Sequence, residues 1–131
     1  MMKTQEELLE LAKQASKNAY APYSKFNVGA CILYESGNYY TGCNVENASY
    51  GLALCAERNA ISNAIAAGEN SKPSMIAVYS PQRKLCYPCG ACRQWLWEFE
   101  NDQHTKIILE NEDSKPISYC INELLPYNFK L

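Results

Sequence analysis

Two short segments, Cys55-Ala56-Glu57 and Pro88-Cys89-Gly90-Ala91-Cys92, hold the residues of this chain whose types and spacing indicate chemistry. They provide three cysteines at a spacing typical of zinc ligands and one carboxylate that is not needed as a ligand. Three protein ligands leave one tetrahedral position of zinc open to water, as in catalytic rather than structural sites. A glutamate beside that position is suited to carry protons. The sequence therefore predicts a zinc hydrolase.

The elements expected around these segments explain how three sulfurs can reach one ion. Cys89 and Cys92 lie three residues apart at the start of a helix predicted over residues 89–100, so both sulfurs share one helix face. Cys55 begins a second predicted helix, over residues 55–67, and approaches the metal from the other side. The partial positive charge of two helix N-termini aimed at one site stabilises thiolates.

Two arginines directly follow residues of the proposed zinc motif. Three thiolates outweigh the charge of Zn²⁺, and the resulting negative charge makes a bound water harder to ionise. Arg58 and Arg93 are placed to offset that charge. We expect at least one of them to donate a hydrogen bond to a ligand sulfur; the alternative is that both are surface residues.

The remaining cysteines and the single histidine are expected outside the chemistry. Cys86 lies three residues before Cys89, but the intervening Pro88 is expected to turn it away from the metal. Core packing is the expected role of the others, which are Cys31, Cys43 and Cys120. The lone His104 lies in a polar loop, which excludes a histidine-based triad and a two-histidine metalloprotease site.

Bulk properties limit the class of protein. The 131 residues suit one domain spanning 1–131, with 47% hydrophobic and 20% charged residues. Seven cysteines without a secretory leader favour metal binding in a reducing cytoplasm over a disulfide framework. A net charge of −2 without a basic run argues against a nucleic-acid partner, and no apolar stretch is long enough for a membrane span.

The order of predicted elements indicates the fold class. Helices are expected over residues 4–19, 55–67, 89–100 and 121–125, and strands over 28–34, 39–45, 75–80, 106–110 and 117–119. Thr4 and Glu7 form a capping box for the first helix, and residues 35–38 suit a hairpin turn. Hairpins that alternate with helical crossovers predict an α/β three-layer sandwich, with a mixed central sheet of about five strands and helices on both faces.

With these residues in view, the chain resembles the cytidine deaminase family, specifically its small homotetrameric type. The matching segments cover nearly the whole chain. They are Ala21-Pro22-Tyr23-Ser24-Lys25-Phe26, Val28-Gly29-Ala30, Gly42-Cys43-Asn44-Val45-Glu46-Asn47-Ala48-Ser49-Tyr50-Gly51, Cys55-Ala56-Glu57-Arg58, Pro88-Cys89-Gly90-Ala91-Cys92-Arg93-Gln94 and Glu123-Leu124-Leu125-Pro126 with Phe129. The zinc motif alone is typical of the wider deaminase superfamily. Together with residues 44–47, it restricts the resemblance to deaminases that act on nucleosides.

The resemblance implies a role for each matching residue. Cys55, Cys89 and Cys92 would hold one zinc per chain, and Glu57 would move protons between water, ring N3 and the departing amino group. Asn44 and Glu46 would bind the ribose 3′-hydroxyl, Phe26 would pack on the pyrimidine, and Ala56 and Tyr87 would contact the base through their backbones. Tyr50 and Phe129 would reach the pocket of a neighbouring subunit in a homotetramer. The implied reaction converts cytidine and deoxycytidine to uridine and deoxyuridine in pyrimidine salvage.

Two residues depart from the family pattern. Asn27 stands where proline commonly follows the phenylalanine, and Tyr87 replaces the usual small residue before Pro88. A ring at position 87 is expected to affect the shape of the pocket and the substituents that C5 can carry.

Three other readings remain open from the sequence. The first keeps the fold and chemistry but deaminates a cytosine nucleoside analogue of the blasticidin type. The second, editing of a polynucleotide, is opposed by the acidic charge and the short chain. The third is a zinc-stabilised interaction module, which needs a fourth protein ligand such as Cys86 and leaves Glu57 without a role.

Overall fold

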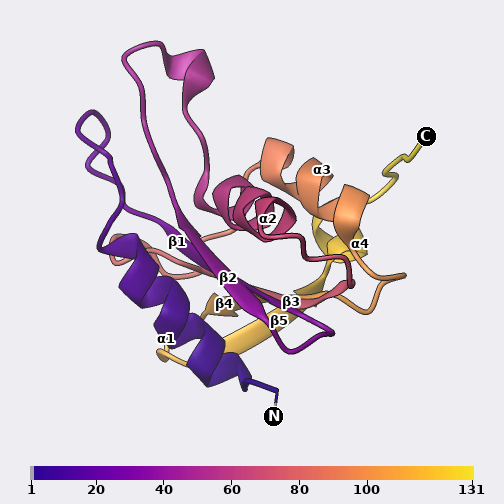
Figure 1. The fold of residues 1–131 in the computed structure, drawn as a ribbon. Helices are drawn as coiled ribbons and strands as arrows, with labels where there is room; N and C mark the ends of the chain where they lie inside the picture. Colours follow the sequence, from indigo (N-terminus) through magenta and orange to yellow (C-terminus); the bar gives the residue numbers. More distant parts are fainter. Residues whose placement is uncertain (1) are drawn as a thin grey trace.

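A five-stranded mixed sheet forms the centre of the protein, in a computed structural model that describes residues 2–131 (Figure 1). The strands, in chain order, are β1 (Gly29–Tyr34), β2 (Tyr39–Cys43), β3 (Pro73–Tyr79), β4 (Lys106–Glu110) and β5 (Pro116–Cys120). Their order across the sheet is β2-β1-β3-β4-β5. The β3–β4 pair is parallel and the other pairs are antiparallel. The predicted mixed sheet is therefore confirmed.

Helices cover both faces of this sheet. The helix α1 (Gln5–Ser16) packs on β1 and β3 from one side, whereas α2 (Ala56–Ala66) packs on β2 and β1 from the other. The helix α3 (Gly90–Phe99) lies beside α2 and contacts the short α4 (Ile121–Leu124), as Figure 1 shows. A 3-10 helix, η1 (Tyr50–Leu52), was not expected from the sequence. Among residues 2–131, no helix combines the length and apolarity that a bilayer crossing requires.

The strand β1 is buried along its whole length and supplies both cores. Alternate side chains of a strand point to opposite faces. Ala30, Ile32 and Tyr34 accordingly join the core beneath α2 and α3, whereas Cys31 and Leu33 join the core beneath α1. The packing role predicted for Cys31 is confirmed.

The first helix begins as predicted. The Thr4 side chain accepts a hydrogen bond from the Glu7 N–H, and the Glu7 carboxylate accepts one from the Thr4 N–H. This reciprocal capping box satisfies backbone donors that a helix N-terminus otherwise leaves without partners.

Close packing of α2 against β2 sets the position of the candidate site. A Cβ atom on Gly42 would lie 2.4 Å from the backbone nitrogen of Ala60, so only glycine allows this approach. The amides of Asn59 and Asn63 donate to the carbonyls of Cys43 and Thr41, at 2.8 and 2.7 Å. Because β2 is an edge strand, these bonds also cover its free backbone groups. The N-terminus of α2 is thereby fixed next to the end of β2.

Glu69 joins the β1–β2 turn to the segment between α2 and β3. Its carboxylate accepts hydrogen bonds from the side chains of Ser36, Asn38, Tyr40 and Ser71. These bonds, the one from Ser71 first, lower the pKa of Glu69 to about 2. The ionised carboxylate therefore stabilises the fold.

Glu69→Gln is expected to lower the melting temperature at pH 7, because an amide cannot accept all of these hydrogen bonds. Folding depresses the pKa from 4.5 to about 2, so the stabilisation is complete above the unfolded value and is lost as the pH falls through that range. Thermal melts of wild type and variant should therefore converge as the pH approaches 2. Glu112→Gln, at an exposed glutamate of the β4–β5 turn, is the control. A constant difference in melting temperature across this pH range would contradict the assignment.

Candidate active site

Three cysteine sulfurs converge where the N-termini of α2 and α3 meet. The Sγ atoms of Cys55, Cys89 and Cys92 all lie within 4.8 Å of one another. Cys55 Sγ is 3.8 Å from Cys89 Sγ, which is 3.5 Å from Cys92 Sγ. The structure therefore brings the three predicted ligands together and leaves Cys86 outside the group.

The separation of these sulfurs suits a zinc ion. Tetrahedral coordination with Zn–S bonds of about 2.3 Å places two sulfurs about 3.8 Å apart. The observed separations of 3.8 and 3.5 Å are close to that value and far longer than a disulfide bond. The three cysteines could thus hold a zinc ion with little rearrangement.

Each of the two helices has a predicted zinc ligand as its N-cap residue. Cys55 is the N-cap of α2 and Cys89 is the N-cap of α3, where the Cys89 sulfur also accepts a hydrogen bond from the Cys92 N–H. Hydrogen bonds from the Cys92 thiol and from Arg58 lower the pKa of Cys55 to about 5. The interaction with Cys55 also raises the pKa of Cys92. The surroundings of Cys55 therefore favour its thiolate, the form of cysteine that binds metal.

The two arginines have different partners. Arg58 Nη2 donates to Cys55 Sγ at 3.4 Å and to the Ala53 carbonyl at 3.3 Å. Arg93 donates instead to the carbonyls of Pro88 and Leu124, at 2.7 and 2.6 Å. Arg58 thus has the geometry expected of the charge-compensating residue, whereas Arg93 fixes the backbone before Cys89 and the end of α4.

Arg58→Ala is expected to weaken zinc binding by about 10- to 100-fold, the usual effect of removing a group that supports a metal ligand. The reason is the loss of a cationic donor on Cys55 Sγ. Competition with a chromophoric chelator measures the affinity. Arg83→Ala, in the exposed β3–α3 loop, is the control and should bind zinc like the wild type. Equal affinities for the two variants would exclude this role for Arg58.

Glu57 lies in the first turn of α2 and is only 4% exposed. Burial, followed by the nearby Cys55 thiolate, raises the pKa of Glu57 to about 7. Its carboxylate is not one of the three clustered ligands, although its residue lines the same cavity. The structure therefore places a buried carboxyl group beside the sulfurs, where the sequence predicted a proton carrier.

A cavity of about 280 Å³ opens onto the sulfur cluster. Its volume is near the lower end of the range for small-molecule sites, about 300–1,000 Å³. Its lining includes six residues for which substrate or catalytic roles were predicted and two of the predicted zinc ligands. They are Phe26, Asn44, Glu46, Ala56, Glu57 and Tyr87, with Cys55 and Cys89. Residues from four separate segments of the chain thus meet in one pocket.

Asn44 follows β2 and holds the loop that carries Phe26. Its Nδ2 donates to the Phe26 carbonyl, and its Oδ1 accepts from the Val28 N–H, both at 2.8 Å. The amide therefore fixes the backbone on each side of residue 27. This positioning role was not visible in the sequence, because the partners lie 16 and 18 residues away.

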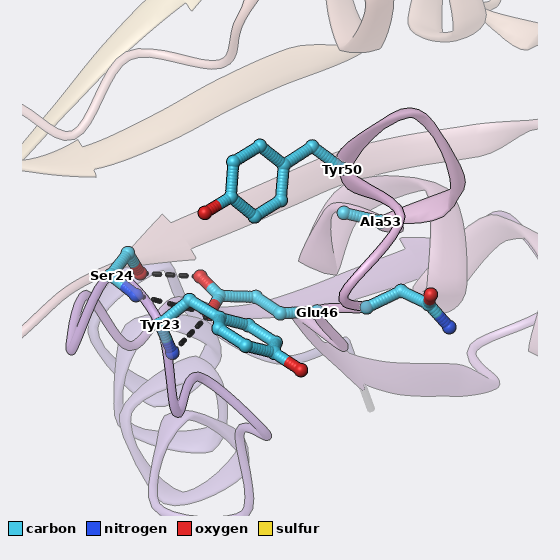
Figure 2. Close-up of a pocket in the computed structure, with 6 residues that line it drawn as sticks. Tyr23, Ser24, Glu46, Tyr50 and Ala53 are labelled. Carbon is cyan, nitrogen blue, oxygen red and sulfur yellow. Dashed lines mark hydrogen bonds between the residues drawn. The ribbon is translucent and has the colours of Figure 1, made fainter.

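Glu46 binds the same loop nearer its N-terminal end, at Tyr23 and Ser24 (Figure 2). Its carboxylate accepts hydrogen bonds from the backbone N–H groups of Tyr23 and Ser24, at 3.0 and 3.2 Å, and from the Ser24 hydroxyl. The Ser24 bonds hold the pKa of Glu46 below its usual range. Ser24 also accepts from the Phe26 N–H at 3.0 Å, so it connects Glu46 to the aromatic residue.

Tyr50 and Phe129 lie outside this cavity. The Tyr50 side chain is 77% exposed on η1 and lines a neighbouring hollow with Tyr23, whose ring centroid is 6.1 Å away (Figure 2). Phe129, in the C-terminal tail, is 65% exposed. Within one chain, neither residue completes the pocket.

Three residues of the pocket were not predicted. Ser24, Val28 and Cys86 line the cavity with the residues named above. The Ser24 hydroxyl, two residues before Phe26, was the available signal, because short polar side chains commonly bond the backbone of a tight loop. Cys86 is buried, which raises its pKa to about 11, so it serves as an apolar wall.

Comparison with known proteins identifies this arrangement. A family model described as the zinc-binding region of cytidine and deoxycytidylate deaminases matches residues 2–108. The cytidine deaminase of Sporosarcina psychrophila is 45% identical over 124 residues, which cover 95% of this chain and 90% of that protein. That of Halalkalibacterium halodurans is 42% identical over 122 residues, covering 93% and 91%.

Solved structures give the same result for the fold. The crystal structure of cytidine deaminase from Burkholderia pseudomallei matches with a TM-score of 0.89 and 42% identity, and covers 97% of this chain and 100% of that one. The cytidine deaminase of Mycobacterium tuberculosis matches with a TM-score of 0.81 and 37% identity, covering 95% and 96%. The sandwich predicted from the sequence is therefore confirmed. The chain belongs to the cytidine deaminase family.

Proposed function

We propose that this protein catalyses the hydrolytic deamination of cytidine and deoxycytidine to uridine and deoxyuridine, with release of ammonia, and serves pyrimidine salvage. One observation carries the proposal: a buried carboxyl group that is not a ligand lies beside a three-sulfur centre, in a cavity sized for a small molecule. A structural zinc site has four protein ligands, and here three leave a position free.

The residues of the chain supply the proton transfers of this reaction. Zinc held by Cys55, Cys89 and Cys92 supplies a Lewis acid that makes water nucleophilic at neutral pH. Glu57 takes a proton from the attacking water and delivers it to N3 of the ring as oxygen adds to C4. It then carries the second proton to the amino group, which leaves as ammonia. Each turnover consumes one water molecule and yields one uridine or deoxyuridine and one ammonia.

Substrate binding is assigned to the groups that line the rest of the cavity. Asn44 uses one N–H and one lone pair to fix the Phe26 loop, so its amide retains one of each for the ribose 3′-hydroxyl. Glu46, ionised and held by Ser24, provides the acceptor for that hydroxyl. Phe26 packs on the base, and Ala56 and Tyr87 contact it through their backbones. Polar groups that pair with the sugar hydroxyl select against ligands without the sugar.

We infer that the protein acts in the cytoplasm as a homotetramer whose sites are completed across subunits. The support is the exposed aromatic residues. Tyr50 begins η1, in the segment between β2 and α2. That segment projects from the body of the molecule (Figure 1), and Phe129 lies on the C-terminal tail. Light scattering should give the mass of a tetramer of 14.8 kDa chains. A stable monomer would refute this assignment.

The reaction is tested by incubating zinc-loaded protein with cytidine and deoxycytidine. The expected result is a falling absorbance of the cytosine ring with release of an equal amount of ammonia. Adenosine, which lacks the pyrimidine C4 amino group, is the control substrate. If zinc is bound but neither nucleoside reacts, the proposed substrates are wrong, and an analogue of the blasticidin type is tested next.

A further inference from the structure

Tyr87 lines the cavity beside the three clustered cysteines. It shares this lining with Cys55, Glu57 and Cys89, and its side chain is 40% exposed. Only the backbone of this residue has a role in the proposed function. The aromatic ring of a residue next to the proposed reacting centre therefore has no assigned role.

A second tyrosine holds this ring in place. The Tyr87 and Tyr119 rings meet edge to face, with centroids 5.6 Å apart, and their hydroxyls are 3.0 Å apart. Tyr119 lies within β5, where it pairs with Ile107 of β4 and packs against the larger core. The sheet thus anchors a side chain that belongs to a loop.

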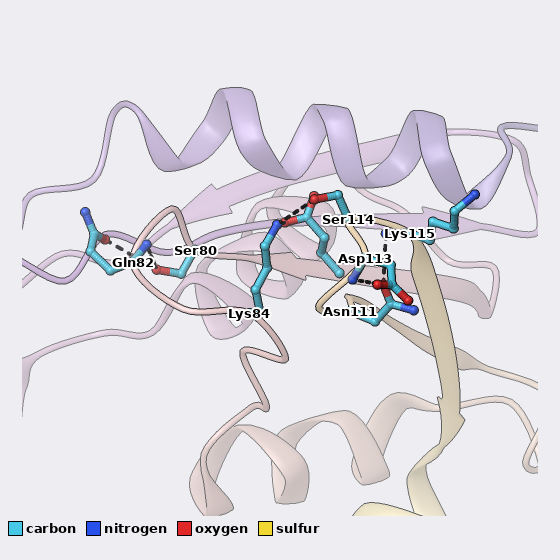
Figure 3. A network of polar contacts seen from close by, with 8 residues as sticks. Ser80, Gln82, Lys84, Asn111, Asp113, Ser114 and Lys115 are labelled. Atoms are coloured by element: carbon cyan, nitrogen blue, oxygen red, sulfur yellow. Dashed lines mark hydrogen bonds and ion pairs between the residues drawn. The ribbon is translucent and has the colours of Figure 1, made fainter.

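The loop that carries Tyr87 is also fastened along its length. The Leu85 N–H donates to the Glu110 carbonyl at 2.9 Å, and Lys84 pairs with the Glu110 carboxylate at the end of β4. Figure 3 shows Lys84 together with its second partner, Ser114, whose Oγ is 3.0 Å from Lys84 Nζ. The Leu85 backbone and the Lys84 side chain therefore attach this loop to the β4–β5 hairpin.

The other side of the loop is tied to the base-binding segment. The Asn27 N–H donates to Gln82 Oε1 at 2.9 Å, and Gln82 is in turn bound to Ser80, as Figure 3 shows. A proline at position 27 would have no N–H for this bond. Asn27 and Tyr87, the two departures from the family pattern, thus both contribute to the contacts of one loop.

We propose that Tyr87, positioned by Tyr119, is a specificity-determining residue that limits bulk on the edge of the pyrimidine next to C4. The inference rests on the proposed function, in which C4 faces the three sulfurs. The neighbours of C4 in the ring are N3, which has no substituent, and C5. Added bulk beside the reacting carbon is therefore carried by C5 or by the amino group itself, and a fixed ring at this wall selects against it.

The test compares kcat/KM for cytidine and 5-iodocytidine in the wild type, Tyr87→Ala, Tyr119→Phe and Tyr39→Phe. Tyr87→Ala is expected to shift the ratio toward 5-iodocytidine by about tenfold or more, the scale of steric discrimination in enzyme pockets. Tyr119→Phe keeps its ring but loses the hydroxyl contact, so it should shift the ratio in the same direction by about threefold. Tyr39→Phe, at an exposed tyrosine of β2, should leave the ratio at the wild-type value.

Calorimetric titration with the products uridine and 5-iodouridine gives the same comparison without turnover. The affinity ratio should change in parallel with the kinetic ratio in Tyr87→Ala. Wild type that turns over cytidine, with a Tyr87→Ala ratio unchanged in both measurements, overturns the inference while the proposed function stands. Wild type that turns over no cytosine nucleoside overturns both.

Discussion

Glu57→Gln is expected to reduce kcat for cytidine by about 10²- to 10⁴-fold, the usual contribution of a positioned acid–base group. Glutamine has nearly the same size and fills the same buried space at the start of α2, but it cannot take up and release a proton. Zinc content should stay at the wild-type level, because Glu57 is not one of the clustered ligands. Steady-state kinetics and metal analysis on the same preparation check both expectations.

A second buried glutamate separates a chemical effect from a structural one. Glu100, at the end of α3, is 3% exposed and accepts a hydrogen bond from the Gln103 N–H, away from the sulfur cluster. Glu100→Gln therefore tests the removal of a buried carboxylate without touching the proposed chemistry. It should retain near wild-type kcat even if its melting temperature falls. An active Glu57→Gln, or equal losses in the two variants, would remove Glu57 from the mechanism.

Most of the secondary structure was predictable because each element has a local signal. The capping box at Thr4 and Glu7 and the hairpin residues 35–38 lie where the structure shows a helix start and a turn. The 3-10 helix η1 lacked such a signal, since Tyr50–Leu52 has no capping side chain and no buried residue. The order of strands was not predicted either. It depends on contacts between distant residues, such as the close packing that Gly42 allows against Ala60.

The three-cysteine cluster was more predictable than the cavity beside it for a similar reason. The ligand positions follow from helix starts and from spacing within a few residues, so Cys89 and Cys92 could be placed on one face. The partners of Asn44 and Glu46 are backbone groups and one side chain, the Ser24 hydroxyl, of the loop 21–28, about 20 residues earlier. Nothing in the local pattern specifies these partners. That loop and β2 are separate segments until the sheet forms. The pocket is thus a product of tertiary structure.

Cys89→Ala is expected to abolish deamination and to lower zinc affinity by more than ~100-fold. Loss of a group that only supports a ligand lowers the affinity by up to that factor, and loss of the ligand itself should cost more. Cys89 is exposed, so its replacement removes a ligand with little effect on packing. Added zinc should raise the melting temperature of the wild type, because a ligand that binds only the folded state stabilises it. It should not do so for Cys89→Ala. Chelator competition and thermal melts with and without zinc measure these effects.

Cys86→Ala is the matched variant, and it decides between a catalytic and a structural zinc site. Cys86 lies three residues before Cys89 and lines the same cavity, but its sulfur is outside the three-sulfur group. Zinc affinity in Cys86→Ala should therefore equal that of the wild type. A loss as large as that of Cys89→Ala would indicate four cysteine ligands and a closed coordination sphere. Water would then have no place on the metal, and Glu57 would have no proton to carry.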